Sequence, residues 1–236
     1  MFEEAPGSLA SEVELDRLLL DAKLSVPEPP ARGSVSRAPL IADARSAHRR
    51  VVGVTAPAGY GKSTLLAEWA RLEDRPVAWV SLDRFDDDPA ALLTLLASAF
   101  ARITPGRERL ADDVRGHGGS ALGRAAPLLA SALRTSPVPF VLMIDDLHVV
   151  RSPACHDVLS VVLAGVPRDS QVIVSSRAEQ PHLARLRAAG QTFEITTSEL
   201  VLDAAGAAAI FADADVPLSP DAVSYTHLTL PTILLV

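Results

Sequence analysis

Short runs of apolar residues alternate along this chain with longer stretches in which apolar positions recur at helical spacing. The apolar runs predict strands at residues 51–55, 77–82, 140–144, 171–175 and 193–195. The helical spacing predicts helices at 1–22, 40–48, 63–71, 88–103, 121–135, 153–163, 181–189 and 203–212, with a loop at 106–119. Apolar strands separated by helices are typical of a parallel sheet covered on both faces, so the sequence predicts the α/β class.

The clearest local signal is the start of the helix at 88–103. Asp88 can cap the free backbone amides, and Pro89 stands at the first helical position. The acidic run 86–88 therefore indicates a helix entry rather than a metal site. Upstream, residues 26–40 are rich in proline, which predicts an extended lead-in.

Charge and composition exclude several classes of protein. The 236 residues carry a formal net charge of −7, which disfavours a surface that grips a nucleic-acid backbone. Cys155 is the single cysteine, so neither an intrachain disulfide nor a cysteine-cluster metal site is possible. The longest apolar stretch, 92–101, is far too short to span a bilayer. We therefore expect a cytoplasmic protein that makes no contact with a membrane.

A phosphate-binding loop is predicted at residues 56–63, where APAGYGKS follows a predicted strand and opens a predicted helix. Its glycines let backbone amides turn toward phosphate oxygens, and the helix start adds its positive dipole end. Lys62 would reach the β and γ phosphates, and the Ser63 hydroxyl would ligate Mg²⁺. The strict pattern has glycine where this chain has Ala56. The residues expected to hold the nucleotide are Ala58, Gly59, Tyr60, Gly61, Lys62, Ser63 and Thr64.

Two further strand ends carry candidate site residues. Asp145 and Asp146 follow an apolar run, which places two carboxylates where open α/β sheets bind ligands. We expect Asp145 to bind Mg²⁺ and Asp146 to orient the attacking water, with helix capping as the alternative. Arg177 can aim its charge at the γ-phosphate, or it is a surface arginine. Asp146, Lys62 and Arg177 are therefore the catalytic candidates, whereas His148 is expected to be a surface or supporting residue.

These segments together resemble one protein family. They are APAGYGKSTLLAEWA at 56–70, VLMIDDLH at 141–148 and VIVSSR at 172–177, preceded by Lys23-Leu24 and Val35-Ser36-Arg37. Over residues 23–222 the chain resembles the MalT-like ATP-binding regulators of the LuxR family, which are signal-transduction (STAND) ATPases related to AAA+ proteins.

The resemblance implies a P-loop NTPase with a five-stranded parallel sheet, in which another strand lies between the phosphate-loop strand and the Asp145 strand. It implies that Val35 and Arg37 lie on the adenine side and that a small helical lid begins near Glu199. The expected divisions are a lead-in at 1–39, the NTPase domain at 40–198, the start of the lid at 199–222 and a tail at 223–236.

The implied function is a switch that binds ATP or ADP with Mg²⁺ and self-associates on ATP binding in the full-length protein. Asp146 stands where faster ATPases carry glutamate, which implies slow hydrolysis. In this family DNA is bound by a C-terminal helix-turn-helix domain that this sequence lacks, so we expect DNA contact only through such a domain. A P-loop kinase of a small molecule or nucleotide, or a nonfunctional truncated fragment, are the alternatives.

The last stretch of the chain differs in composition from the rest. Residues 224–236 contain no alanine, glycine, arginine or acidic residue, and SYTHLTLPT resembles a translated sequencing adapter. We therefore expect residues 223–236 to be non-native and the natural protein to continue beyond residue 222.

Overall fold

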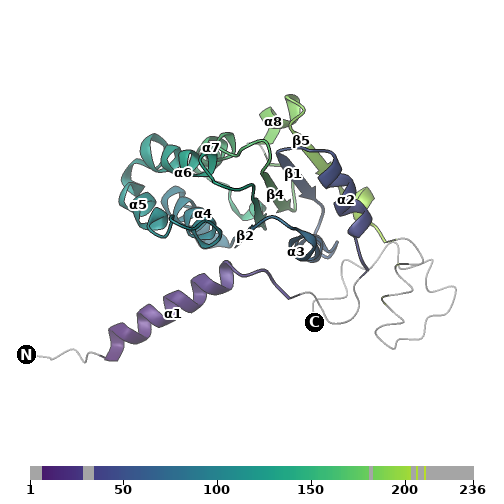
Figure 1. Cartoon of the computed structure of the whole chain (residues 1–236). Coiled ribbons are helices and arrows are strands. Elements are labelled where there is room, and N and C mark those ends of the chain that lie inside the picture. Colours follow the sequence, from purple (N-terminus) through teal and green to yellow (C-terminus); the bar gives the residue numbers. More distant parts are fainter. Residues whose placement is uncertain (1–6, 29–34, 181–182, 203–205, 207–209, 211–236) are drawn as a thin grey trace, which may run out of the picture.

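The sheet has five parallel strands in the order β2-β3-β4-β1-β5 (Figure 1). The computed structural model describes residues 7–28, 35–180, 183–202, 206 and 210. The strands are β1 Val51–Thr55, β2 Val77–Ser81, β3 Val141–Asp145, β4 Gln171–Ser176 and β5 Thr192–Ile195. Strand β4 lies between the phosphate-loop strand β1 and the Asp145 strand β3, as the resemblance implies. The P-loop NTPase fold is therefore confirmed.

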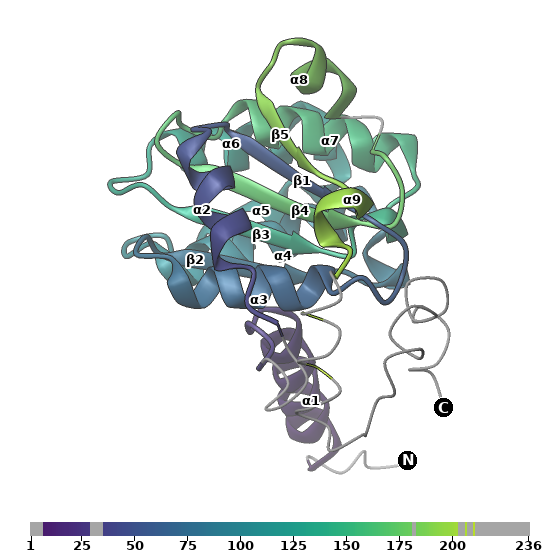
Figure 2. The same cartoon turned by 90° about the vertical axis from the view of Figure 1, so that its right-hand side faces the viewer.

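Helices cover both faces of this sheet, as predicted. They are α1 Gly7–Lys23, α2 Ala38–Ser46, α3 Lys62–Leu72, α4 Pro89–Ile103, α5 Leu110–Gly116, α6 Ala126–Arg134, α7 Pro153–Ala164, α8 Ala184–Ala188 and α9 Thr197–Leu200. Helices α4 to α7 lie on one face and α2 with α3 on the other (Figure 2). Successive strand residues point to opposite faces, so Val172 and Val174 join the first cluster and Ile173 the second.

The predicted helix start at Asp88 is confirmed. The Asp88 carboxylate accepts hydrogen bonds from the backbone N–H groups of Ala90 and Ala91, at 3.0 and 2.9 Å. The neighbouring carboxylates are also occupied, because Asp87 accepts from two backbone N–H groups and Asp86 pairs with Lys23. The three carboxylates of the acidic run therefore all have partners within the fold, which agrees with the interpretation of this run as a helix entry.

Helix α1 projects from the domain and is fixed at its carboxyl end (Figures 1 and 2). There the Lys23 ammonium lies 2.9 Å from Asp83 and 2.8 Å from Asp86, which are the N-cap and the last residue of the short 3₁₀ turn Arg84–Asp86. Leu24 packs into the core next to this contact. The side chains of Leu15, Leu18 and Leu19 stay more than half exposed.

The predicted loop at 106–119 is wrong, because it contains helix α5. Leu110 and Val114 lie four positions apart, so both face the core beside α4, although this seven-residue helix is too short to give a clear periodic signal. The helix predicted at 121–135 begins with a π-helical turn at Ala121–Ala125. Pro127 has no N–H to donate in the turn that follows.

Several expectations fall on residues outside the described part of the chain. The helix at 203–212, most of the lid at 199–222 and the tail at 223–236 are among them, and the domain divisions stay predictions. Within the described residues, no helix is both long enough and apolar enough to cross a membrane.

Candidate nucleotide site

The loop between β1 and α3 leads into an open helix start, which here means that no N-cap side chain bonds to the first turn of α3. Gly59 and Gly61 have φ angles of +85° and +73°, in the left-handed region that favours glycine. Gly61 is the N-cap of α3 and supplies no side-chain hydrogen bond to the first turn. The N–H groups of that turn therefore face the loop without a side-chain acceptor, which is the arrangement that binds anions at helix N-termini.

The Lys62 side chain is buried inside this loop. Only 6% of the residue is exposed, and its ammonium donates a hydrogen bond to the Pro57 carbonyl at 2.8 Å. Burial lowers the pKa of Lys62 and the charge of Arg177 adds to this effect, whereas Asp146 and Asp145 oppose it. Within the described residues this ammonium forms no salt bridge, so a buried cation is left with capacity for an anion.

Asp145 is held at the carboxyl end of β3 by the neighbouring strand. Its carboxylate accepts a short hydrogen bond from the Ser175 hydroxyl and another, at 3.1 Å, from the Asp146 N–H. The same N–H also approaches the Ser175 oxygen, at 2.9 Å. Sequence reasoning missed Ser175, although a serine inside the apolar run 171–175 is a signal that could have identified it.

Asp146 leaves the strand in a left-handed conformation, with φ +58°. This turn brings its carboxylate to the surface, where 42% of the side chain is exposed and Oδ1 lies 3.5 Å from Nδ1 of His148. Arg177 is exposed at the end of β4, and its charge acts on both Lys62 and His148. The structure thus places Asp145, Asp146 and Arg177, from two other segments of the sequence, close enough for their charges to act on Lys62.

Two buried polar atoms near these strand ends have no hydrogen-bond partner among the described residues. They are Nδ1 of His148, just after β3, and Oε1 of Gln180, in the segment after β4. The Gln180 amide nitrogen donates to Ser176 at 2.8 Å, so the side chain is anchored at the sheet edge. Buried polar groups are nearly always paired, so each exception calls for an explanation, such as a catalytic role or a bound water or ion.

The oxygen atoms near Lys62 suit Mg²⁺. Ser63 is an exposed residue at the start of α3, and the buried Asp145 carboxylate is close enough for its charge to act on Lys62. The described residues contain no group of three or more His, Cys, Asp or Glu side chains that could hold a metal ion. A cation here would take most of its ligands from phosphate and water, which is how Mg²⁺ binds in nucleotide sites.

Arg37 lies between α3 and α9. The Arg37 N–H donates to Glu68 at 2.8 Å, and its guanidinium donates to the Leu200 carbonyl at 2.6 Å. Val35 is half-buried. Their contact with adenine stays a prediction, as do the catalytic, metal and phosphate roles of the other candidates.

Known relatives cover most of this chain. It is 29% identical over 188 residues to the HTH-type transcriptional regulator MalT of Yersinia enterocolitica. The aligned region covers 79% of this chain and 21% of the relative. The chain is 32% identical over 187 residues to the protein of the same name from Klebsiella pneumoniae, which covers 78% and 20%. The chain thus spans about a fifth of the length of these relatives. No family model matches it. The resemblance to MalT-like regulators is confirmed.

Two solved structures are more distant. AMPPCP-bound DnaA from Aquifex aeolicus has a TM-score of 0.41 at 14% identity, with 96% of this chain and 57% of that chain covered. Drosophila ORC bound to DNA has a TM-score of 0.40 at 14% identity, with 96% and 62% covered. These values do not support a functional argument.

Proposed function

We propose that this chain binds ATP and ADP with Mg²⁺ and hydrolyses ATP slowly, as the switch domain of a LuxR/MalT-type transcriptional regulator. The observation that carries the proposal is the buried ammonium of Lys62 at the open start of α3. A buried charge that has only a carbonyl acceptor is costly, and a phosphate supplies the missing counter-charge.

The loop and Lys62 would bind the phosphates. The backbone N–H groups of residues 59–64 point their dipoles at phosphate oxygens, and Lys62 exchanges the Pro57 carbonyl for a β or γ oxygen. Ser63 and Asp145 would hold Mg²⁺, which neutralises the negative charge on the phosphates when bound. The hydrogen bond from Ser175 keeps the Asp145 carboxylate oriented for this role.

Asp146 would orient the water that attacks the γ-phosphorus. Its carboxylate is 42% exposed whereas Asp145 is buried, so the two acidic side chains can serve different ligands. The bond from the γ-phosphorus to the bridging oxygen breaks, and ADP and phosphate leave. Arg177, exposed at the end of the neighbouring strand, would stabilise charge on the γ-phosphate and so distinguish ATP from ADP.

The roles of a longer protein follow only by analogy with the relatives. These relatives are HTH-type transcriptional regulators. We propose that DNA is bound through a helix-turn-helix domain outside this sequence, and that the full-length protein self-associates when ATP replaces ADP.

The test measures binding and turnover separately. A fluorescent ATP analogue is titrated with Mg²⁺ and with excess chelator, and phosphate release is followed in a single turnover. We expect saturable binding of ATP and ADP, tighter with Mg²⁺ for ATP, and slow phosphate release. Absence of saturable binding by either nucleotide would refute the proposal, and transfer of phosphate to an added small molecule would favour the kinase alternative.

A further inference from the structure

His148 lies next to the proposed water-orienting carboxylate. It belongs to the short 3₁₀ turn Leu147–Val149 that follows β3, and only 17% of its side chain is exposed. Its Nδ1 is buried, lies 3.5 Å from Oδ1 of Asp146 and has no completed hydrogen bond among the described residues. A small rotation of either side chain would close this contact to hydrogen-bond length.

The chemistry of the two groups fixes which atom carries the proton. A carboxylate oxygen only accepts hydrogen bonds, so an imidazole nitrogen that faces it must be a donor. Burial and the charges of Arg177, Lys62 and Arg151 lower the pKa of His148 more than Asp146 raises it. The neutral ring has one proton to place, and the carboxylate favours Nδ1.

The Asp146 carboxylate needs such an anchor. Its backbone is fixed, because its N–H is held by Asp145 and Ser175 and its φ angle is +58°. The side chain is 42% exposed, so its rotamer is not set by packing. His148 stands on the buried side of this carboxylate and can therefore select one orientation.

We propose that His148 is a positioning residue whose Nδ1–H holds the Asp146 carboxylate in the orientation that activates water. The proposal rests on the proposed function of Asp146. His148 itself touches neither the water nor the nucleotide, so its loss slows hydrolysis and leaves nucleotide affinity unchanged.

Two variants distinguish hydrogen bonding from packing. The amide nitrogen of asparagine lies near the position of Nδ1, whereas that of glutamine lies near Nε2. We expect His148→Asn to keep single-turnover hydrolysis within about threefold, and His148→Gln to lose about tenfold or more, with the same Kd for the ATP analogue in both. His117→Ala, which removes an exposed histidine just after α5, is the matched control and leaves both quantities unchanged.

A ring tautomer measurement tests the contact without any turnover. Long-range ¹H–¹⁵N spectra of the protein report which ring nitrogen is protonated. We expect the Nδ1–H form for His148 in the parent and the Nε2–H form in Asp146→Ala. An Nε2–H ring in the parent would overturn the contact.

The two measurements separate this proposal from the proposed function. Equal hydrolysis by His148→Gln and the parent, or equal loss in the asparagine and glutamine variants, would overturn positioning by Nδ1. If the parent binds nucleotide but hydrolyses none, the assignment of Asp146 fails and positioning fails with it, although the tautomer result still decides whether the two side chains are bonded.

Discussion

The two lysines of this chain are both partly withdrawn from solvent, but their surroundings differ. Lys23 lies between two carboxylates, at 2.8 and 2.9 Å from Asp86 and Asp83. Burial alone would lower the pKa of Lys23, but these carboxylates raise it above its usual value. Lys62 is more deeply buried, has a carbonyl as its hydrogen-bond acceptor, and has a lowered pKa.

This difference separates a structural cation from a binding cation. The Lys23 ammonium has its counter-charges within the fold, so it stabilises the junction between α1 and the domain. The Lys62 ammonium is desolvated, and no carboxylate pairs with it directly among the described residues. Such a group gains free energy from an added anion, so the same residue type serves two purposes.

The largest expected effect is on nucleotide affinity. Lys62→Ala should raise the Kd of a fluorescent ATP analogue about 100-fold, because it removes a desolvated cation worth about 3 kcal/mol to a phosphate contact. Lys23→Ala is the matched control and should leave that Kd unchanged. A Lys62→Ala protein that binds the analogue as tightly as the parent would break the comparison.

The second effect separates the two carboxylates near Lys62. Asp146→Ala should bind ATP normally and release phosphate at least about 30-fold more slowly, because the water loses its acceptor. Asp145→Ala should instead lose most of the gain in affinity that Mg²⁺ gives the parent. Titrations with and without Mg²⁺, together with single-turnover hydrolysis, measure both. An equal loss of Mg²⁺-dependent affinity in the two variants would show that their roles are misassigned.

The strands and the glycine loop could be predicted from the sequence because each leaves a local signal. Apolar runs gave all five strands, and Gly59 and Gly61 occupy the left-handed conformations that their spacing indicates. The end of β3 was placed one residue early, because Asp145 pairs within the sheet although it is charged. Its hydrogen bond from Ser175 stabilises a carboxylate at a buried strand position.

The features that could not be predicted include both a contact between distant segments and local conformations. No local pattern connects Lys23 with Asp83 and Asp86, which lie about sixty residues away. The approach of His148 to Asp146 depends on the left-handed turn that follows β3. Helix α5 was missed because seven residues with only two buried positions are too few to establish a helical period.

A third, smaller effect concerns stability. Lys23→Ala should lower the free energy of unfolding by about 1–2 kcal/mol, because it leaves the buried Asp86 carboxylate without its cation. Thermal or urea unfolding measures this loss. Adding Asp86→Asn to Lys23→Ala should recover part of it, since no unpaired charge then remains. Equal stability of the parent and Lys23→Ala would show that the ion pairs contribute nothing.

The same ion pairs give a pH dependence whose sign follows from the two pKa shifts. The hydrogen bond and charge of Lys23 outweigh burial and lower the pKa of Asp83 below 3.8, so its contribution is present above pH 3.8 and is lost as the pH falls through the lower value. The raised pKa of Lys23 gives a contribution that is present below pH 10.5 and lost above it. The stability difference between the parent and Lys23→Ala should therefore be constant near neutral pH and shrink at both extremes.

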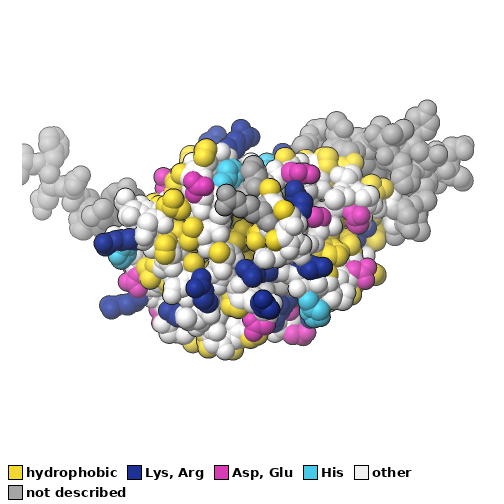
Figure 3. Space-filling model, turned by 90° about the horizontal axis from the view of Figure 1, so that it is seen from above, with side chains coloured by type: hydrophobic (Ala, Val, Ile, Leu, Met, Phe, Trp, Pro, Cys, Tyr) yellow, Lys and Arg dark blue, Asp and Glu magenta, His cyan; other side chains and the backbone are white. Residues whose placement is uncertain are grey.

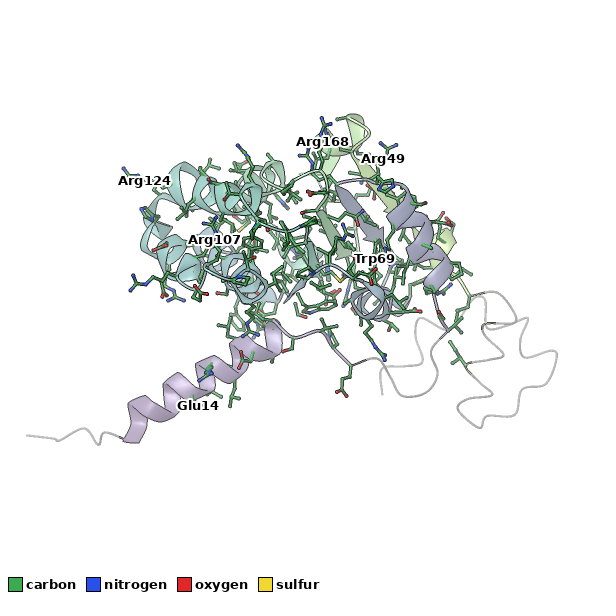
Figure 4. The ribbon with its side chains drawn as sticks, viewed as in Figure 1. Glu14, Arg49, Trp69, Arg107, Arg124 and Arg168 are labelled. Carbon is green, nitrogen blue, oxygen red and sulfur yellow. The ribbon has the colours of Figure 1, made fainter. Side chains whose placement is uncertain are left out.

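The smallest expected effect is on DNA, where we expect no binding at all. If phosphate recognition belongs to the loop around Lys62, the rest of the surface should not attract a phosphate backbone. The net charge is −7, and Arg49 and Arg168 lie on the face at the top of Figure 4, where basic side chains alternate with acidic and hydrophobic ones (Figure 3). The Arg49 guanidinium also donates a hydrogen bond to the Gly190 carbonyl, at 2.8 Å.

A mobility shift at low salt, where electrostatic binding is strongest, should show no complex for the parent or for Lys62→Ala. A salt-sensitive complex formed by both proteins at submicromolar concentration would show that surface residues of this domain bind the DNA phosphates. Lys62 would then no longer differ from the other cations in binding phosphate.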